Sequence, residues 1–155
     1  MPQYSNFIGA REFAGQLVNP RHREGDIKQI FDFVTVAANF PVNDFISFGR
    51  IPSNAVIHWN MSRLIWDAAL GAGRLLQVGT NIAPGAIGAN IDASVASGNA
   101  GAPAYNRAVN TFGQNLWQLE GQTRDNQLSR DLRVQLTGGA GPGAAFGLGL
   151  ILYYT

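Results

Sequence analysis

The sequence predicts a mainly β protein, folded as an antiparallel β-sandwich or jelly roll. Three observations predict this class. About seven or eight short stretches have the apolar–polar alternation, or the β-branched and aromatic content, that strands require. Pro, Gly, Asn and Asp residues separate these stretches and predict turns. No helical segments alternate with the strands, and an isolated hairpin is marginal in water, so the strands are expected to pack as two sheets.

The composition predicts one domain at residues 26–155, preceded by an extended N-terminal arm at residues 1–25 with no sustained period. The 155 residues include no cysteine, which excludes disulfides, thiolate nucleophiles and Cys-ligated metals. A net charge of +1 offers no broad basic field for nucleic acid, and no apolar run is long enough for a membrane span. Charged residues are only 14% of the chain, so other subunits are expected to cover part of its surface.

The first predicted strand starts at Lys28, in the stretch KQIFDFVTVAANF. Its two alternating sets of side chains are both partly apolar, which predicts a strand buried on much of its length. One set is Ile30, Asp32, Val34 and Val36, and the other is Phe31, Phe33 and Thr35.

The stretch FGRIPSNAVIHWNMSRLIW, residues 48–66, predicts a β-hairpin that turns at Pro52, Ser53 and Asn54. Its second strand would place Val56, His58, Asn60, Ser62 and Leu64 on one face, and Ile57, Trp59, Met61, Arg63 and Ile65 on the other. We expect the second of these faces to point to the core. A further strand at residues 74–80 would then close a four-stranded meander.

Residues 81–110 are rich in Ala, Gly and Asn and predict a long excursion between strands. Helical turns are expected in it, one beginning at Asn90 or Asp92 and one beginning at Pro103.

The last third of the chain returns to strand patterns. The first lies around Leu116, Trp117 and Leu119. The second covers residues 131–138, where Leu132, Val134 and Leu136 share a face opposite Arg133 and Gln135. The third covers residues 144–155, where one face carries Phe146, Leu148, Leu150, Leu152 and Tyr154. The glycine-rich run between the last two strands is expected to be a hairpin loop. Gly147 and Gly149 share the other face of the last strand, which implies close approach by another backbone or a bulky side chain.

No stretch of the sequence predicts a catalytic, metal or cofactor site. His22 and His58 have no partner at ligand spacing, and His58 is expected to be a half-buried, hydrogen-bonded strand residue. The glycine run ends in a strand pattern, so it lacks the helix that a phosphate-binding loop requires. The carboxylates are expected to serve turns and caps, and Trp59, Trp66 and Trp117 to be core or interface anchors. We therefore predict a protein that is not an enzyme and takes no cofactor.

The order of these features resembles small structural proteins of tailed-bacteriophage heads. The resemblance is carried by GDIKQIFDF, by an Ile-Pro-x-x-Ala-x-Ile segment from Ile51, by Asp-x-x-Leu-Gly from Asp67, by Leu-x-Val-Gly from Leu76 and by Ile-Asp-Ala from Ile91. It covers residues 25–97 and, more loosely, the C-terminal strands. It implies a non-enzymatic decoration or cement protein that sits on the capsid surface of the virion and clamps neighbouring major capsid protein subunits. A homotrimer is favoured over a dimer, and no catalytic residue carries over.

The N-terminal arm and residues 81–110 are the expected contacts with the capsid. The candidate interface residues are Arg11, Phe13, Arg21, His22, Arg23, Tyr105 and Arg107. Two alternatives remain open at the level of sequence. One is a head–tail connector or tail subunit, and the other is a carbohydrate-binding β-sandwich module, which would expose coplanar aromatic side chains.

Overall fold

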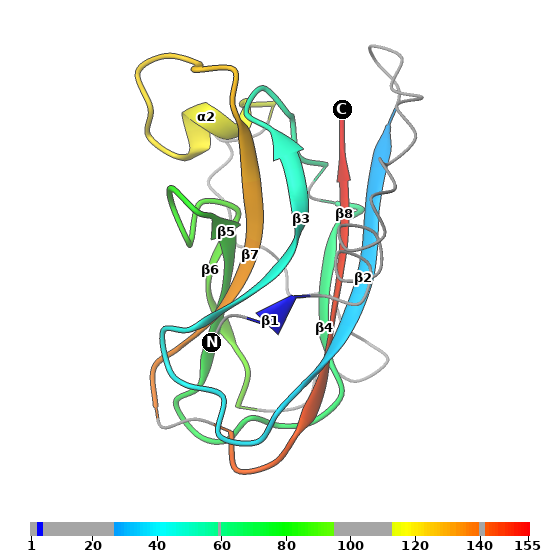
Figure 1. Cartoon of the computed structure of the whole chain (residues 1–155), viewed down its shortest axis with the longest axis vertical. Coiled ribbons are helices and arrows are strands. Elements are labelled where there is room, and N and C mark those ends of the chain that lie inside the picture. The colour runs from blue at the N-terminus through cyan, green and yellow to red at the C-terminus, as the bar shows by residue number, and fades with distance from the viewer. Residues whose placement is uncertain (1–2, 5–26, 59, 95–112, 140–141) are drawn as a thin grey trace.

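Two β-sheets pack face to face in the computed structural model, which describes residues 3–4, 27–58, 60–94, 113–139 and 142–155 (Figure 1). The five-stranded sheet has the order β1-β3-β7-β5-β6, and the three-stranded sheet has the order β2-β8-β4. Neighbouring strands are antiparallel except β1 and β3, which are parallel. The predicted β-sandwich is confirmed. Its elements are β1 (Gln3–Tyr4), β2 (Lys28–Val36), β3 (Phe45–Pro52), β4 (Arg63–Trp66), β5 (Leu75–Thr80), β6 (Gly88–Asp92), the short helix α2 (Leu116–Leu119), β7 (Ser129–Thr137) and β8 (Phe146–Tyr154).

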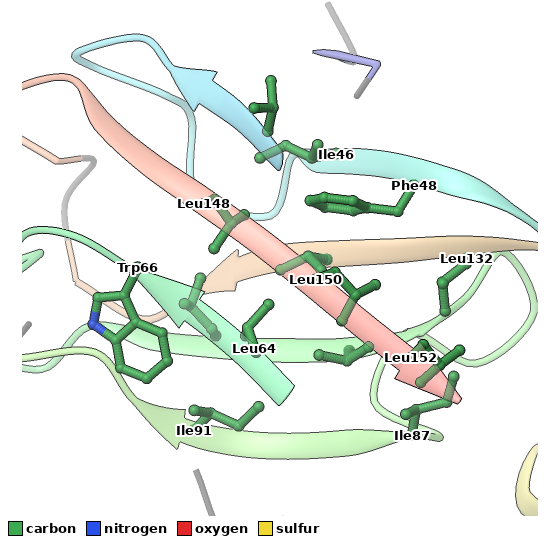
Figure 2. Packing of buried hydrophobic residues seen from close by; sticks show 14 of the residues in the cluster. Ile46, Phe48, Leu64, Trp66, Ile87, Ile91, Leu132, Leu148, Leu150 and Leu152 are labelled. Atoms are coloured by element: carbon green, nitrogen blue, oxygen red, sulfur yellow. The ribbon is translucent and has the colours of Figure 1, made fainter. Parts of the chain in front are cut away.

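Strand β8 is the centre of the three-stranded sheet, hydrogen-bonded to β2 on one side and to β4 on the other. The predicted alternation along it is confirmed, because Leu148, Leu150 and Leu152 are buried in the core (Figure 2). In the opposing sheet, β7 buries the face carrying Leu132, Val134 and Leu136, also as predicted. The core thus forms between the inner faces of the two sheets.

The predicted hairpin around Pro52 is wrong. The turn itself is present, since the Ala55 amide donates to the Pro52 carbonyl at 3.1 Å. However, β3 pairs with β7 and β4 pairs with β8, so the turn is a corner that carries the chain from one sheet to the other. The four-stranded meander is therefore wrong as well. The partners of β3 and β4 are strands near the C-terminus, and a turn motif contains no information about partners so far along the chain.

The predicted faces of residues 56–65 are reversed in β4. The amides of Met61 and Ser62 both donate to the His58 carbonyl at 3.1 Å, which makes a second turn within the predicted strand. This turn resets the alternation, so Leu64 and Trp66 are buried, and Met61, Arg63 and Ile65 are exposed. Ile57, which precedes the turn, is buried as expected. Trp59 lies outside the described residues.

Asn90 and Asp92, the two residues predicted to begin a helical turn, belong to strand β6, and the turn predicted to follow them lies mostly outside the described residues. The loop before β6 folds back over β5, which pairs with β6. A Cβ added at Gly79 would lie 2.0 Å from the Pro84 carbonyl oxygen, so only glycine fits there. The helical turn predicted from Pro103 lies outside the described residues.

Residues 116–119 form a helical turn, although their pattern predicts a strand. Gln118 Oε1 accepts a hydrogen bond from the Asn115 amide at 2.9 Å, which satisfies a donor at the start of the turn. Gly121, with φ +74°, ends it in the left-handed region. A local hydrogen bond at the start of the turn and a left-handed glycine at its end thus override a short apolar pattern. The glycine-rich run after β7 is likewise not a hairpin loop, because β7 and β8 belong to different sheets.

Candidate interaction surface

The outer face of the five-stranded sheet carries polar side chains that bond to one another. Arg50 Nε lies 2.9 Å from Asp131 Oδ1, and Arg133 Nη2 lies 3.4 Å from Asp131 Oδ2. Beside them, Gln77 Nε2 donates to Gln135 Oε1 across the β5–β7 pair. A face with this chemistry is compatible with contact to water and needs no partner to cover it.

The outer face of the three-stranded sheet is apolar at its centre. Phe31 is 63% exposed, Phe33 is 57% exposed and Ile65 is 36% exposed, although all are large apolar residues. The prediction that this strand is buried on much of its length is therefore wrong, because only Asp32, Val34 and Val36 of β2 are buried. We call this surface the Phe33 face; it consists of Phe31, Phe33 and Thr35 on β2, Gly147, Gly149 and Ile151 on β8, and Arg63, Ile65 and Asp67 on and just after β4.

Three cross-strand rows define the geometry of the Phe33 face. The central row joins Phe33, Gly149 and Ile65. A Cβ added at Gly149 would lie 3.7 Å from the Phe33 Cβ and 4.0 Å from the Ile65 Cβ. The two side chains therefore flank a position on β8 that has none.

The two charged residues of the Phe33 face lie on opposite sides of this central row. Arg63 is at the start of β4, and it forms no ion pair within the described part of the chain. Asp67 follows the end of β4, where its Oδ1 accepts a hydrogen bond from the Gly147 amide at 2.7 Å. That carboxylate is the side chain that approaches Gly147 closely, as the glycine there predicted. Asp67 lies four positions after Arg63, which is about 13 Å along an extended chain, so the two charges do not pair with each other.

A buried ion pair fixes helix α2 and its following loop to the five-stranded sheet. Arg130 Nε lies 2.8 Å from Glu120 Oε2, and the side chains are 1% and 0% exposed. Thr80 of β5 donates its hydroxyl to Glu120 Oε1, and Arg130 Nη1 donates to the Leu128 carbonyl at 3.0 Å. This pair was not predicted, because Glu120 was expected to serve a turn and Arg130 lies just before a predicted strand. Because both side chains are buried, we assign this ion pair a role in stabilising the fold.

Two carboxylates with lowered pKa values, those of Asp92 and Asp125, accept hydrogen bonds in turns. The Ser53 hydroxyl and then the Gln127 amide donate to Asp125, and these bonds lower the pKa of its carboxyl. A hydrogen bond from the Ser94 amide lowers the pKa of Asp92 in the same way. Burial raises the pKa of the Tyr154 phenol. Both carboxylates therefore stay ionised as turn acceptors, in agreement with the turn role that the sequence predicts.

Two solved structures share this fold. A chain of the cyanophage Pam1 capsid asymmetric unit is similar over 90% of this chain and 91% of its own length, with a TM-score of 0.58 and 18% identity. A chain of the capsid of Ralstonia phage GP4 is similar over 100% of this chain and 97% of its own, with a TM-score of 0.52 and 22% identity. The fold occurs in phage capsids. The expected likeness to phage head proteins is confirmed at the level of fold, whereas no protein-family model and no curated protein sequence matches the chain.

The predicted interface residues Arg11, Phe13, Arg21, His22, Arg23, Tyr105 and Arg107 all lie outside the described residues. His58 is half-buried as predicted, but it lies in a turn. Its amide donates to the Tyr153 carbonyl at 2.8 Å. Its side-chain Nε2, which was expected to be hydrogen-bonded, is buried with no hydrogen-bond partner among the described residues. Trp66 is a core residue, as expected of an apolar anchor.

The described residues contain neither a metal-binding cluster nor a membrane-spanning helix. No group of three His, Asp or Glu side chains is placed to hold a metal ion within the described ranges. In the same part of the chain, no helix has the length and apolar character to cross a membrane. The candidate surface that sequence reasoning missed is the Phe33 face. Its signal was present as the alternating phenylalanines of β2, which were interpreted as part of a strand buried on much of its length.

Proposed function

We propose that the chain is a non-enzymatic structural protein of a phage virion, which binds the outer surface of the assembled capsid and clamps neighbouring major capsid protein subunits. The observation that carries the proposal is the shared fold with two phage capsid chains over at least 90% of their lengths and of this one. Because the likeness extends end to end, it concerns the whole domain rather than one motif.

The topology supports a clamp with two separate contacts. Strand β1 forms one edge of the five-stranded sheet and β6 forms the opposite edge. The N-terminal arm includes β1, and the excursion at residues 81–110 includes β6. The two segments proposed to bind the capsid are therefore anchored on opposite edges of one sheet, and a clamp that joins neighbouring subunits needs two such points.

Binding would stabilise the shell by mass action. A ligand that binds the assembled coat and has no affinity for separate coat subunits shifts the equilibrium toward the assembled state, by RT ln(1 + [L]/Kd) per site. No chemical step is needed, and the fold has only to hold the contacts rigid. The two sheets with their shared core provide this rigidity.

Co-sedimentation tests the proposal directly. The purified chain is mixed with capsid particles of its source and pelleted, and the bound amount is measured against the major capsid protein. We expect saturable binding at a fixed ratio. A chain that stays in the supernatant at every concentration would contradict the proposal and favour a connector role or a glycan-binding role, which binding to immobilised glycans would then test.

Deletion of residues 1–25 is expected to leave the sandwich folded and to weaken particle binding by about tenfold or more, because one of the two proposed contacts is lost. The far-ultraviolet circular dichroism and the melting temperature report the fold, and co-sedimentation reports binding. Loss of the fold would instead show that this segment belongs to the core. Unchanged binding would show that the arm makes no contact with the capsid.

A further inference from the structure

The Phe33 face has the chemistry of an interface core. Its centre is occupied by Phe31, Phe33 and Ile65, and its two charges lie toward the ends of β4. Protein interfaces have the same pattern, with aromatic anchors and few charges at the centre and polar groups at the rim. The other outer face of the sandwich has the opposite pattern, because its arginines are paired with Asp131 at the centre of the sheet. One face of this molecule is thus suited to water and the other to a partner.

We infer that the Phe33 face docks against the Phe33 face of a second copy of the chain. The two-fold axis would lie midway between the two stacked sheets, perpendicular to their strands, along the row of Phe33, Gly149 and Ile65. Two such sheets would stack about 10 Å apart, as the sheets of a sandwich do. The inference does not depend on binding to a capsid.

The charges of the face argue for a copy of itself as the occupant. The proposed axis places β4 of one copy opposite β4 of the second copy, with the two strands pointing in opposite directions. It therefore brings Arg63 of each copy opposite Asp67 of the other and forms two equivalent ion pairs. A two-fold interface has this reciprocity, since residue i contacts residue j and j contacts i. A face that carried two charges of the same sign at these positions would repel its copy.

The sizes of the side chains fit the same axis. Ile151 lies one row from the centre in one direction, and Gly147 lies one row from it in the other. The axis places Ile151 of each copy over Gly147 of the second copy, beside the Asp67 carboxylate that lies against that glycine. It places Phe31 of each copy over Thr35 of the second copy. A large side chain therefore meets a smaller residue on both strands.

Sedimentation velocity of the full chain over a range of concentrations tests the inference. We expect a monomer–dimer equilibrium, and we expect Phe33→Ser to raise its dissociation constant about tenfold or more, because the substitution removes a central aromatic anchor. Leu128→Ser is the matched control, because Leu128 is 62% exposed and lies outside the Phe33 face. A chain that is monomeric at all concentrations, or a dimer as sensitive to Leu128→Ser as to Phe33→Ser, would overturn the inference.

A charge-exchange experiment tests the axis itself. Arg63→Glu and Asp67→Lys should each weaken self-association about tenfold, because each places like charges opposite one another in both pairs. An equimolar mixture of the two variants should recover association, because both pairs then join opposite charges across the interface. Arg124→Glu, an exposed charge reversal elsewhere, should change nothing. Failure of the mixture to associate, with both variants folded by circular dichroism, would overturn the proposed axis. Where Asp67→Lys fails to fold, Phe33→Ser still tests the face.

Discussion

Replacement of Glu120 by alanine is expected to lower the free energy of unfolding by about 3–5 kcal/mol. The substitution leaves the Arg130 guanidinium in the interior, where the side chain is 1% exposed, without the carboxylate that forms its ion pair. Arg130 Nη2 is already buried without a hydrogen-bond partner among the described residues, so the group has no spare interaction to compensate. Thr80 loses its acceptor at the same time. A domain of this size has a stability of about 5–15 kcal/mol, so the loss is a large fraction of it.

Urea denaturation followed by tryptophan fluorescence measures this effect. The matched control is Asp131→Ala, on the neighbouring residue of β7, whose ion pairs with Arg50 and Arg133 lie on the solvent-facing side of the sheet. Exposed pairs contribute about 0–1 kcal/mol, so the control should lose little. The double variant Glu120→Gln with Arg130→Met should recover much of the loss, because it removes the isolated charge. A Glu120→Ala loss no larger than that of Asp131→Ala would show that the buried pair does not stabilise the fold.

The strands that could be predicted from the sequence are those whose own alternation matches the two sides of a sheet. β7 and β8 alternate over nine residues each, and the buried and exposed sets lie where the pattern placed them. Their neighbours in the sheets could not be predicted, because pairing depends on residues far apart in the chain. β3, for example, pairs with β7, which lies about eighty residues later. The turn at Pro52 was found correctly, but its role as a corner depends on those distant partners.

The candidate surface was partly visible in the sequence. Phe31 and Phe33 stood out as apolar residues opposite a buried set, and the low content of charged residues indicated a covered surface. The alternation fixes which residues share a face, but it does not distinguish a face covered by the same chain from one left for a partner. Ile65 was assigned to the core because the alternation was extended from Val56 through residue 65 without a break. A turn made by backbone hydrogen bonds to the His58 carbonyl interrupts it and shifts the faces of the later residues. Backbone bonds of this kind leave little signal in residue type.

Leu150→Ala is expected to lower the free energy of unfolding by about 2–5 kcal/mol, because it opens a cavity in the middle of the core. Leu150 is 0% exposed and lies on the central strand of its sheet (Figure 2). The matched control is Ile151→Ala on the next residue of the same strand, whose side chain is on the Phe33 face. In the monomer this second substitution removes a half-buried side chain and should cost about 1 kcal/mol or less.

The two substitutions should also differ in their dependence on protein concentration. A cavity in the core destabilises the chain equally at low and high concentration, because it acts within one molecule. The loss from Ile151→Ala should grow as concentration rises, because the wild-type dimer is stabilised by mass action and the variant dimer is weakened. Urea denaturation at two concentrations on either side of the dimer dissociation constant separates the cases. Equal losses from both variants at both concentrations would mean that β8 is buried to the same degree on both faces within a single chain, and the Phe33 face would then need no second copy.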